Sequence, residues 1–179
     1  MSFRSFLEKL DKENNLVHIK KECDINLEIS NVLNALDEKP VLFERVKNYD
    51  QKVAGGICGS RKTMAFALNT TVEGVLQKMV DAIDNPKEPE IISDAPCQEV
   101  IEEDPDLSKL PLLKYLSKDG GRYIPSGIVI VKDPVNGRNV CYHRLMEIGK
   151  NKLVGRIIKQ RGTDKALQNA GGEIEFAMC

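Results

Sequence analysis

The spacing of apolar residues changes along the chain, and this change constrains the fold more than any other feature. Phe3, Phe6, Leu7 and Leu10 recur every three or four residues, which predicts an amphipathic helix with Ser2 as its N-cap. From Tyr123 onward apolar and polar residues alternate instead, which is typical of strands. We therefore expect an α+β fold, with an N-terminal α/β domain over residues 1–113 and a β-rich domain over residues 114–179.

The same spacing rules predict the other elements. Helices are expected over residues 27–36, 61–68, 71–83 and 166–170, and strands over residues 16–22, 40–46, 52–60, 97–103 and 173–179. The Pro-rich and charged segment 85–96 suits an exposed connection. Three strands in a meander are expected between residues 123 and 160, with turns at 133–137 and 149–152. The last strand is apolar, and an unpaired apolar edge favours aggregation unless another segment packs against it. The chain is therefore expected to be a fragment or to depend on a partner.

Composition limits the possible partners. The 26 Lys and Arg residues balance 27 Asp and Glu residues and leave a net charge of −1, while aromatic residues make up only 5% of the chain. These values argue against a nucleic-acid-binding protein. No apolar run reaches the length of a transmembrane helix, and no signal peptide is recognisable. The five cysteines contain no C-x-x-C pair, so we expect a reduced, cytoplasmic protein without a zinc site or disulfides.

The most basic stretch runs from Asn139 to Gly162. Alternation along its first strand would place Asn139, Cys141 and His143 on one face. The opposite face would carry Val140, Tyr142, Arg144 and Met146, and Arg156 would oppose Ile157 in the same way. The arginines of this stretch are Arg144, Arg156 and Arg161. They either bind an anionic cofactor or substrate or form an ordinary solvated basic surface.

Three other features are weaker candidates for a site. The glycine-rich segment 55–63 is either a phosphate cradle at a helix start or a tight strand-to-helix turn, and it lacks the spacing of a Walker loop. His18 lies in an apolar strand and is expected to be structural. The acidic run 99–106 either attracts a metal or is a solvated face. No Ser/His/Asp or Cys/His pattern of a nucleophilic enzyme stands out.

Several motifs together resemble one family. The segment GRYIPSGIVIVKDPVNGRNVCYHRLMEIGKNKLVGRIIKQRG, residues 121–162, is similar to the strand, DP turn, N-x-x-x-x-R, I-G-K-N-K-L and R-G elements of the UbiD-like decarboxylases. Upstream, VLFERV, APCQEVI and DPDLSKLPLLKY stand where that family has related elements. The resemblance spans nearly all 179 residues and is most specific in residues 139–162.

The resemblance implies a reversible, non-oxidative decarboxylase that uses prenylated FMN. It also implies a divalent metal, Mn²⁺ or Mg²⁺, often with K⁺, that clamps the cofactor phosphate. An α/β domain would precede a flavin-reductase-like split β-barrel that holds the cofactor. A flavin prenyltransferase would supply that cofactor, and the substrate would be an aromatic or α,β-unsaturated carboxylic acid.

The motif also implies roles for single residues. Asn139 matches the metal-binding asparagine, and Arg144 the arginine beside both flavin and substrate carboxylate. The expected cofactor contacts are Tyr142, His143, Arg144, Arg156, Ile157, Ile158, Arg161 and Gly162. Some branches of the family have a metal-binding histidine at the position of Gly162, so that ligand is absent here.

The family's second metal-binding glutamate, its catalytic acidic residues and a phosphate-binding lysine have no counterpart in this sequence. Two hypotheses follow. The chain is the N-terminal part of a decarboxylase and is inactive alone, or it is a non-catalytic flavin- or anion-binding module that assembles with a full-length homologue. A homo-oligomer or a partner chain is expected in either case.

Overall fold

The computed structural model describes residues 2–179, which divide into two compact units. The N-terminal unit comprises the chain up to Asp24 and Glu28–Asp104, and the C-terminal unit comprises Ile25–Leu27 and Pro105–Cys179. The α-helices are α1 (Phe3–Lys12), α2 (Glu28–Leu36), α3 (Arg61–Leu68), α4 (Gly74–Asp84) and α5 (Gly162–Asn169). Short 3₁₀ helices are η1 (Pro96–Gln98) and η2 (Leu107–Lys109). The strands are β1 (Val17–Ile19), β2 (Val41–Phe43), β3 (Val53–Gly55), β4 (Tyr123–Ile124), β5 (Ile128–Asp133), β6 (Gly137–Tyr142), β7 (Leu145–Gly149), β8 (Lys152–Gly155) and β9 (Phe176–Met178).

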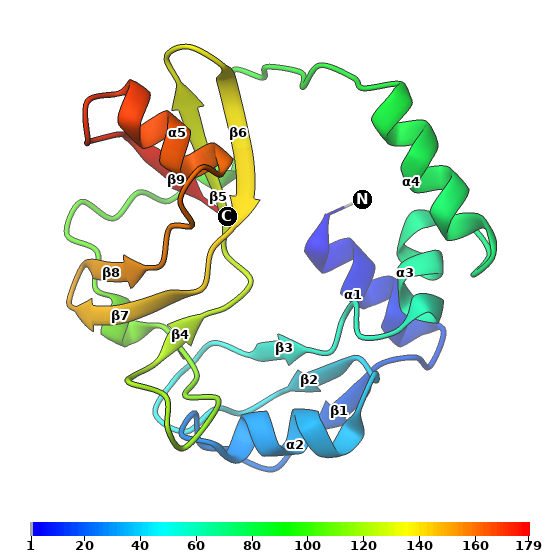
Figure 1. The fold of residues 1–179 in the computed structure, drawn as a ribbon. Coiled ribbons are helices and arrows are strands. Elements are labelled where there is room, and N and C mark those ends of the chain that lie inside the picture. Colours follow the sequence, from blue (N-terminus) through cyan, green and yellow to red (C-terminus); the bar gives the residue numbers. More distant parts are fainter. Residues whose placement is uncertain (1) are drawn as a thin grey trace. The chain divides into compact units, whose positions relative to one another are not determined.

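The N-terminal unit is a small sheet with helices (Figure 1). Its strand order is β1-β2-β3, with β1 parallel and β3 antiparallel to β2. Helix α2 lies against this sheet so closely that a Cβ on Gly55 would come within 2.6 Å of Leu33 Cδ2. Helices α1 and α3 meet through Phe6 and Phe66, whose ring centroids are 5.9 Å apart. The expected Ser2 cap is confirmed, because Ser2 and Ser5 form a capping box.

The expected helix over residues 71–83 forms as α4 and begins later, at Gly74. Thr71 Oγ1 accepts the Gly74 N–H at 3.2 Å, while Glu73 makes no side-chain cap. The segment 85–94 is fully exposed, as its composition predicts. The expected strand over residues 97–103 is wrong. Pro96 begins a 3₁₀ turn there, and Val100 and Ile101 remain exposed rather than pairing with another strand.

The C-terminal unit contains two three-stranded sheets, with orders β4-β7-β8 and β6-β5-β9. The single meander expected for residues 123–160 is therefore wrong, although both predicted turns form: 133–137 joins β5 to β6, and 149–152 joins β7 to β8. The chain leaves one sheet after Tyr142 and enters the other at Leu145 (Figure 1). His143 and Arg144 are the two residues of this crossover.

The core of the C-terminal unit consists of Val129, Val131, Leu145 and Ala166. Ala166 belongs to α5, which packs on β5 and β6. This helix begins at Gly162, four residues before the expected start. Strand β9 pairs antiparallel with β5 and lies at the edge of its sheet. The strand expected through Arg156 and Ile157 is also wrong, because β8 ends at Gly155.

Within residues 2–179, no helix combines the length and the apolar character that crossing a membrane requires.

Candidate functional site

Three side chains of the basic stretch converge on one hydroxyl group. Thr163 Oγ1 lies 3.0 Å from His143 Nε2 and 3.1 Å from Cys141 Sγ. Asn139 Nδ2 donates to the same oxygen at 3.5 Å. The prediction that Asn139, Cys141 and His143 point the same way is thus confirmed, and Tyr142 on the opposite face is 71% exposed. Arg144 and Met146, which the alternation predicts for that opposite face, lie beyond β6, in the crossover and in β7.

Thr163 is a site residue that the sequence did not single out. It is buried to 8% exposure in the first turn of α5, and its one hydroxyl can donate once and accept twice. The helix expected from the sequence begins only at Ala166, three residues after Thr163. Its position directly after Arg161 and Gly162 is the one signal that could have drawn attention to it.

Gly162 makes room for the Asn139 side chain. A Cβ at position 162 would overlap Asn139 Oδ1 and would lie 2.8 Å from its Cγ. Because real Cβ atoms avoid such distances, any larger residue would require the Asn139 amide to move. Asn139 and Gly162 are therefore in van der Waals contact, although they lie 23 positions apart in the sequence. The family motif implies a metal ligand at Asn139 and a cofactor contact at Gly162.

Arg144 has a different set of neighbours. Its Nη2 donates to Asp119 Oδ1 at 2.8 Å, and its guanidinium carbon lies 4.0 Å from the centroid of the Tyr123 ring. The Arg144 side chain is 49% exposed, whereas that of Asp119 is 10% exposed. Burial acts to raise the pKa of Asp119, but hydrogen bonds from the Leu116 N–H and from Arg144 outweigh it, and the net shift is downward. Asp119 is thus an ionised anchor for Arg144.

The other predicted cofactor residues follow β8. Arg156, Ile157 and Ile158 lie outside any helix or strand, and all three are exposed. Arg161 is exposed and precedes the first residue of α5. Ile157 lines a cavity of about 220 Å³ together with His143 and Thr163. The remaining walls of this cavity come from the core strands and from Leu167, Ile174 and Phe176.

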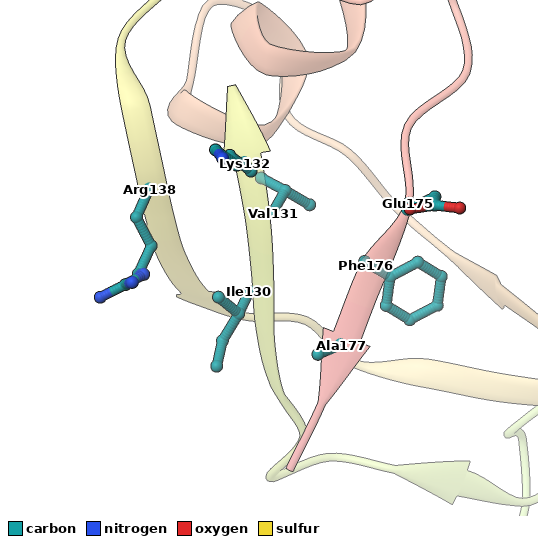
Figure 2. A pocket seen from close by; sticks show the side chains of 7 residues that line it. All are labelled: Ile130, Val131, Lys132, Arg138, Glu175, Phe176 and Ala177. Atoms are coloured by element: carbon teal, nitrogen blue, oxygen red, sulfur yellow. The ribbon is translucent and has the colours of Figure 1, made fainter. Parts of the chain in front are cut away.

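A second hollow, of about 510 Å³, lies on β5, β6 and β9 (Figure 2). Its cationic residues are Lys132 and Arg138, and Glu175 lies at the other end of its lining. None of the predicted site residues lines it. The cavity of about 220 Å³ is lined by two predicted site residues, His143 and Ile157, and this hollow by none.

Two of the weaker candidates, His18 and the glycine-rich segment, make local structural contacts. His18 Nδ1 lies 2.7 Å from Glu44 Oε1, and its Nε2 lies 3.0 Å from Asp11 Oδ1. The glycine-rich segment forms a strand-to-helix turn, in which Ser60 Oγ accepts the Thr63 N–H at 3.2 Å. Among residues 2–179, no three His, Cys, Asp or Glu side chains are arranged to hold a metal, and this includes the acidic run 99–106.

Comparison with known proteins identifies the family. The profile of the 3-octaprenyl-4-hydroxybenzoate carboxy-lyase N-terminal domain matches residues 7–83. The profile of the Rift-related domain of the same carboxy-lyase, UbiD, matches residues 90–179. Together the two profiles cover most of the chain.

Relatives in sequence and in structure agree with this. Anhydromevalonate phosphate decarboxylase of Methanothermobacter thermautotrophicus is 33% identical over 98% of this chain and 41% of its own length. The Methanosarcina mazei protein of the same name is 34% identical over 91% of this chain and 37% of its own length. An evolved dimeric form of the UbiD-class enzyme HmfF from Pelotomaculum thermopropionicum, solved in complex with prFMN, is 34% identical with a TM-score of 0.92. The match covers 99% of this chain and 43% of the HmfF chain.

The chain thus spans about two fifths of the length of the relatives it matches. Its helices and sheets reproduce the fold of the corresponding part of the UbiD-class enzymes. Two profiles of this family match the chain in consecutive order, and 99% of the chain superposes on the HmfF structure. This chain therefore belongs to the UbiD family.

Proposed function

We propose that this chain forms the N-terminal part of a non-oxidative decarboxylase that uses prenylated FMN. The substrate class is an aromatic or α,β-unsaturated carboxylic acid. Residues 1–113 form the α/β domain, and residues 114–179 contribute to a split β-barrel that holds the cofactor. The named relatives are decarboxylases, and the HmfF structure contains prFMN.

The observation that carries the proposal is that the Arg144 guanidinium is fixed in place and yet accessible. Its guanidinium is held by Asp119 and Tyr123 and is still half-exposed. An arginine fork suits a carboxylate, because its N–H groups match the two oxygens. Arg144 therefore orients the substrate carboxylate, which the family motif assigns to this position.

The residues around the cavity fit a flavin-type cofactor. Ile157 offers apolar surface, His143 and Thr163 offer polar groups at the same cavity, and exposed Arg156 and Arg161 can pair with a phosphate. The remaining members of the proposed contact set are Tyr142, Ile158 and Gly162. When bound, the cofactor supplies the electron sink that decarboxylation needs. The protein supplies orientation of the carboxylate and exclusion of water.

The residues present do not complete a site for Mn²⁺ or Mg²⁺. Such ions prefer several oxygen ligands, mainly carboxylates and phosphates. Asn139 offers one amide oxygen, and within residues 2–179 no acidic cluster stands beside it. The family metal, and K⁺ with it, would need ligands from the cofactor phosphate, from water and from another segment. No step of the chemistry is assigned to the metal.

The partners follow from the same proposal. A flavin prenyltransferase supplies the cofactor in the cytoplasm. A further segment or a second chain supplies the catalytic acidic residues and covers the edge strand β9, because an open apolar edge favours association. Two-chain assemblies occur among the matched structures, as in the vanillic acid decarboxylase ShVdcCD of Sedimentibacter hydroxybenzoicus, which is 25% identical with a TM-score of 0.82.

The test is co-expression of the chain with a flavin prenyltransferase and with the downstream segment of the family. We expect bound prenylated FMN and CO₂ release from a carboxylic acid substrate, both measured on the purified complex. Arg144→Ala should abolish CO₂ release while the flavin absorbance is retained. The matched control is Arg138→Ala, because Arg138 is exposed on β6 and lies outside the proposed site.

Two outcomes would contradict the proposal. Full turnover by the 179-residue chain alone would show that no further segment is required. Flavin binding without turnover, even when the downstream segment is present, would favour the non-catalytic module.

A further inference from the structure

We propose that Asp119 is the positioning residue of Arg144, holding its guanidinium against Tyr123 so that the remaining N–H groups face the substrate carboxylate. This inference rests on the proposed role of Arg144. It adds a residue that neither the basic stretch nor the family motif singles out, since Asp119 lies 25 positions before Arg144.

Asp119 is itself fixed by the loop that carries it. Its Oδ2 accepts the Leu116 N–H at 2.9 Å, while its Oδ1 accepts from Arg144 at 2.8 Å. The two carboxylate oxygens therefore accept hydrogen bonds from different partners, Oδ2 from the loop backbone and Oδ1 from Arg144. With a side-chain exposure of only 10%, the carboxylate has little freedom to rotate.

The loop that carries Asp119 is attached firmly to β7. Gly120 and Gly121 lie so close to this strand that a Cβ on either would come within 3.3 Å of the Met146 side chain. The next residue, Arg122, pairs with Glu147 at 2.6 Å, and both side chains are mostly buried. Because Arg144 directly precedes β7, the anchor and the arginine belong to one rigid frame.

Tyr123 supports the guanidinium from one side. Its ring centroid lies 4.0 Å from Arg144 Cζ, within the range of a cation–π contact. Strand β4 fixes the ring, because Tyr123 pairs in register with Met146 of β7. Asp119 and Tyr123 therefore restrict both the direction and the plane of the guanidinium.

The contact with Asp119 occupies one of the five N–H groups of Arg144. The half-exposed side chain leaves other donors available to a second carboxylate. The fixed negative charge of Asp119 weakens the attraction of that carboxylate to Arg144. The arrangement thus favours correct orientation over tight binding. Loss of the anchor is therefore expected to lower kcat and, because the carboxylate then binds more tightly, to lower KM as well.

The test uses the co-expressed complex and Asp119→Asn. Loss of the anchor should lower kcat by about tenfold to a hundredfold, because small displacements of an orienting group cost about that much. KM for the carboxylate should fall, because a competing charge is removed. The matched control is Asp106→Asn, which removes a loop carboxylate that accepts the Ser108 N–H. It should change neither constant.

A second readout needs no catalysis. In the side-chain ¹⁵N NMR spectrum of the 179-residue chain, rotation of the Arg144 guanidinium should be slow in the wild type and fast in Asp119→Asn. If Asp119→Asn does not fold, Tyr123→Leu replaces it, since it keeps β4 apolar and removes only the ring face. It should lower kcat and speed guanidinium rotation in the same way.

The outcomes separate this inference from the proposed function. If Arg144→Ala leaves turnover unchanged, the role of Arg144 is wrong and the proposed function fails. If Arg144→Ala abolishes turnover while Asp119→Asn leaves kcat, KM and guanidinium rotation unchanged, only the positioning role of Asp119 is overturned. A higher KM with an unchanged kcat would overturn it as well.

Discussion

The amide of Asn139 occupies the space that a side chain at position 162 would fill, so Gly162 determines where Asn139 can point. Asn139 Nδ2 is at the same time within 3.5 Å of Thr163 Oγ1. The start of α5 therefore holds the asparagine from two consecutive positions.

Gly162→Ala should move the Asn139 amide without unfolding the chain. The overlap falls on the end of one side chain, which can rotate away, and alanine is favoured over glycine in a helix by up to about 1 kcal/mol. We expect the free energy of unfolding to change by less than about 1 kcal/mol. The Asn139 side-chain amide resonances in a ¹⁵N NMR spectrum should shift clearly.

The control for this experiment is Gly149→Ala, where an added Cβ would meet only ordinary contacts. It should leave the Asn139 resonances in place. Unchanged Asn139 resonances in Gly162→Ala would contradict the steric role of Gly162.

Thr163→Val should destabilise the C-terminal unit. The substitution keeps the shape of the side chain but removes the hydroxyl that His143, Cys141 and Asn139 share. These three partners are only half-buried, so the loss of the shared hydrogen bonds should cost about 1 kcal/mol. Urea unfolding should show this loss in Thr163→Val and recover most of it in Thr163→Ser, which restores the hydroxyl. Equal stability of the valine and serine variants would argue against a hydroxyl-centred cluster.

Local patterns were sufficient for much of the fold. The spacing of Phe6 and Leu10 predicted α1 because a helix buries one face, and the DP turn predicted the hairpin of β5 and β6. The break at His143 and Arg144 could not be predicted in this way. The alternation continues through both residues without glycine or proline, and the change of sheet depends on distant partners, since β4 pairs with β7 and β9 with β5.

Local patterns likewise predicted only the part of the candidate site that lies on one stretch of chain. A period of two residues correctly grouped Asn139, Cys141 and His143, because they lie on one strand and its continuation. Thr163 and Asp119 approach this stretch from 20 and 25 positions away. No local signal marks such residues, because their role arises only when two sheets and a helix pack together. Several motif residues, Arg156 among them, are exposed, so their proposed role depends on a bound cofactor.

His18 should make the stability of the N-terminal unit depend on pH. Hydrogen bonds to Glu44, and secondarily to Asp11, raise the pKa of His18 above its ordinary value of 6.5 in the folded chain. A raised pKa means that the contribution is complete below the unfolded pKa and is lost as the pH rises through the folded pKa. The stability advantage of the wild type over His18→Gln should therefore be largest below about pH 6.5 and decrease at higher pH.

Chemical unfolding between pH 5 and pH 8 checks the effect of His18. Glu44→Gln should reduce the pH dependence more than Asp11→Asn, because Glu44 is the main cause of the shift. A difference between the wild type and His18→Gln that does not vary with pH would rule out this linkage.

Asp133 should dominate the acid response of the C-terminal unit. It is buried to 4% exposure and its side chain accepts from Asn136 Nδ2 at 2.7 Å and from the Val135 N–H at 2.9 Å. It also accepts from Asn169 Nδ2 of α5 at 3.0 Å, which ties the hairpin turn to the helix. These hydrogen bonds, that of Asn136 first, lower the pKa of Asp133 from 3.8 to about 2.

A lowered pKa means that this contribution is present above the unfolded pKa and is lost as the pH falls through the folded pKa. The stability advantage of the wild type over Asp133→Asn should thus be constant above about pH 4 and disappear between about pH 4 and pH 2. Urea unfolding at a series of pH values measures it. Asp84→Asn, at the exposed end of α4, serves as the control and should show no such loss. Because Asp133 joins the turn to Asn169 at the C-terminal end of α5, the same acid range should release that end of the helix, and the Asn169 side-chain amide resonances should shift in parallel with the loss of stability. Asn169 resonances that stay in place while stability falls would show that the turn and the helix end respond to acid independently.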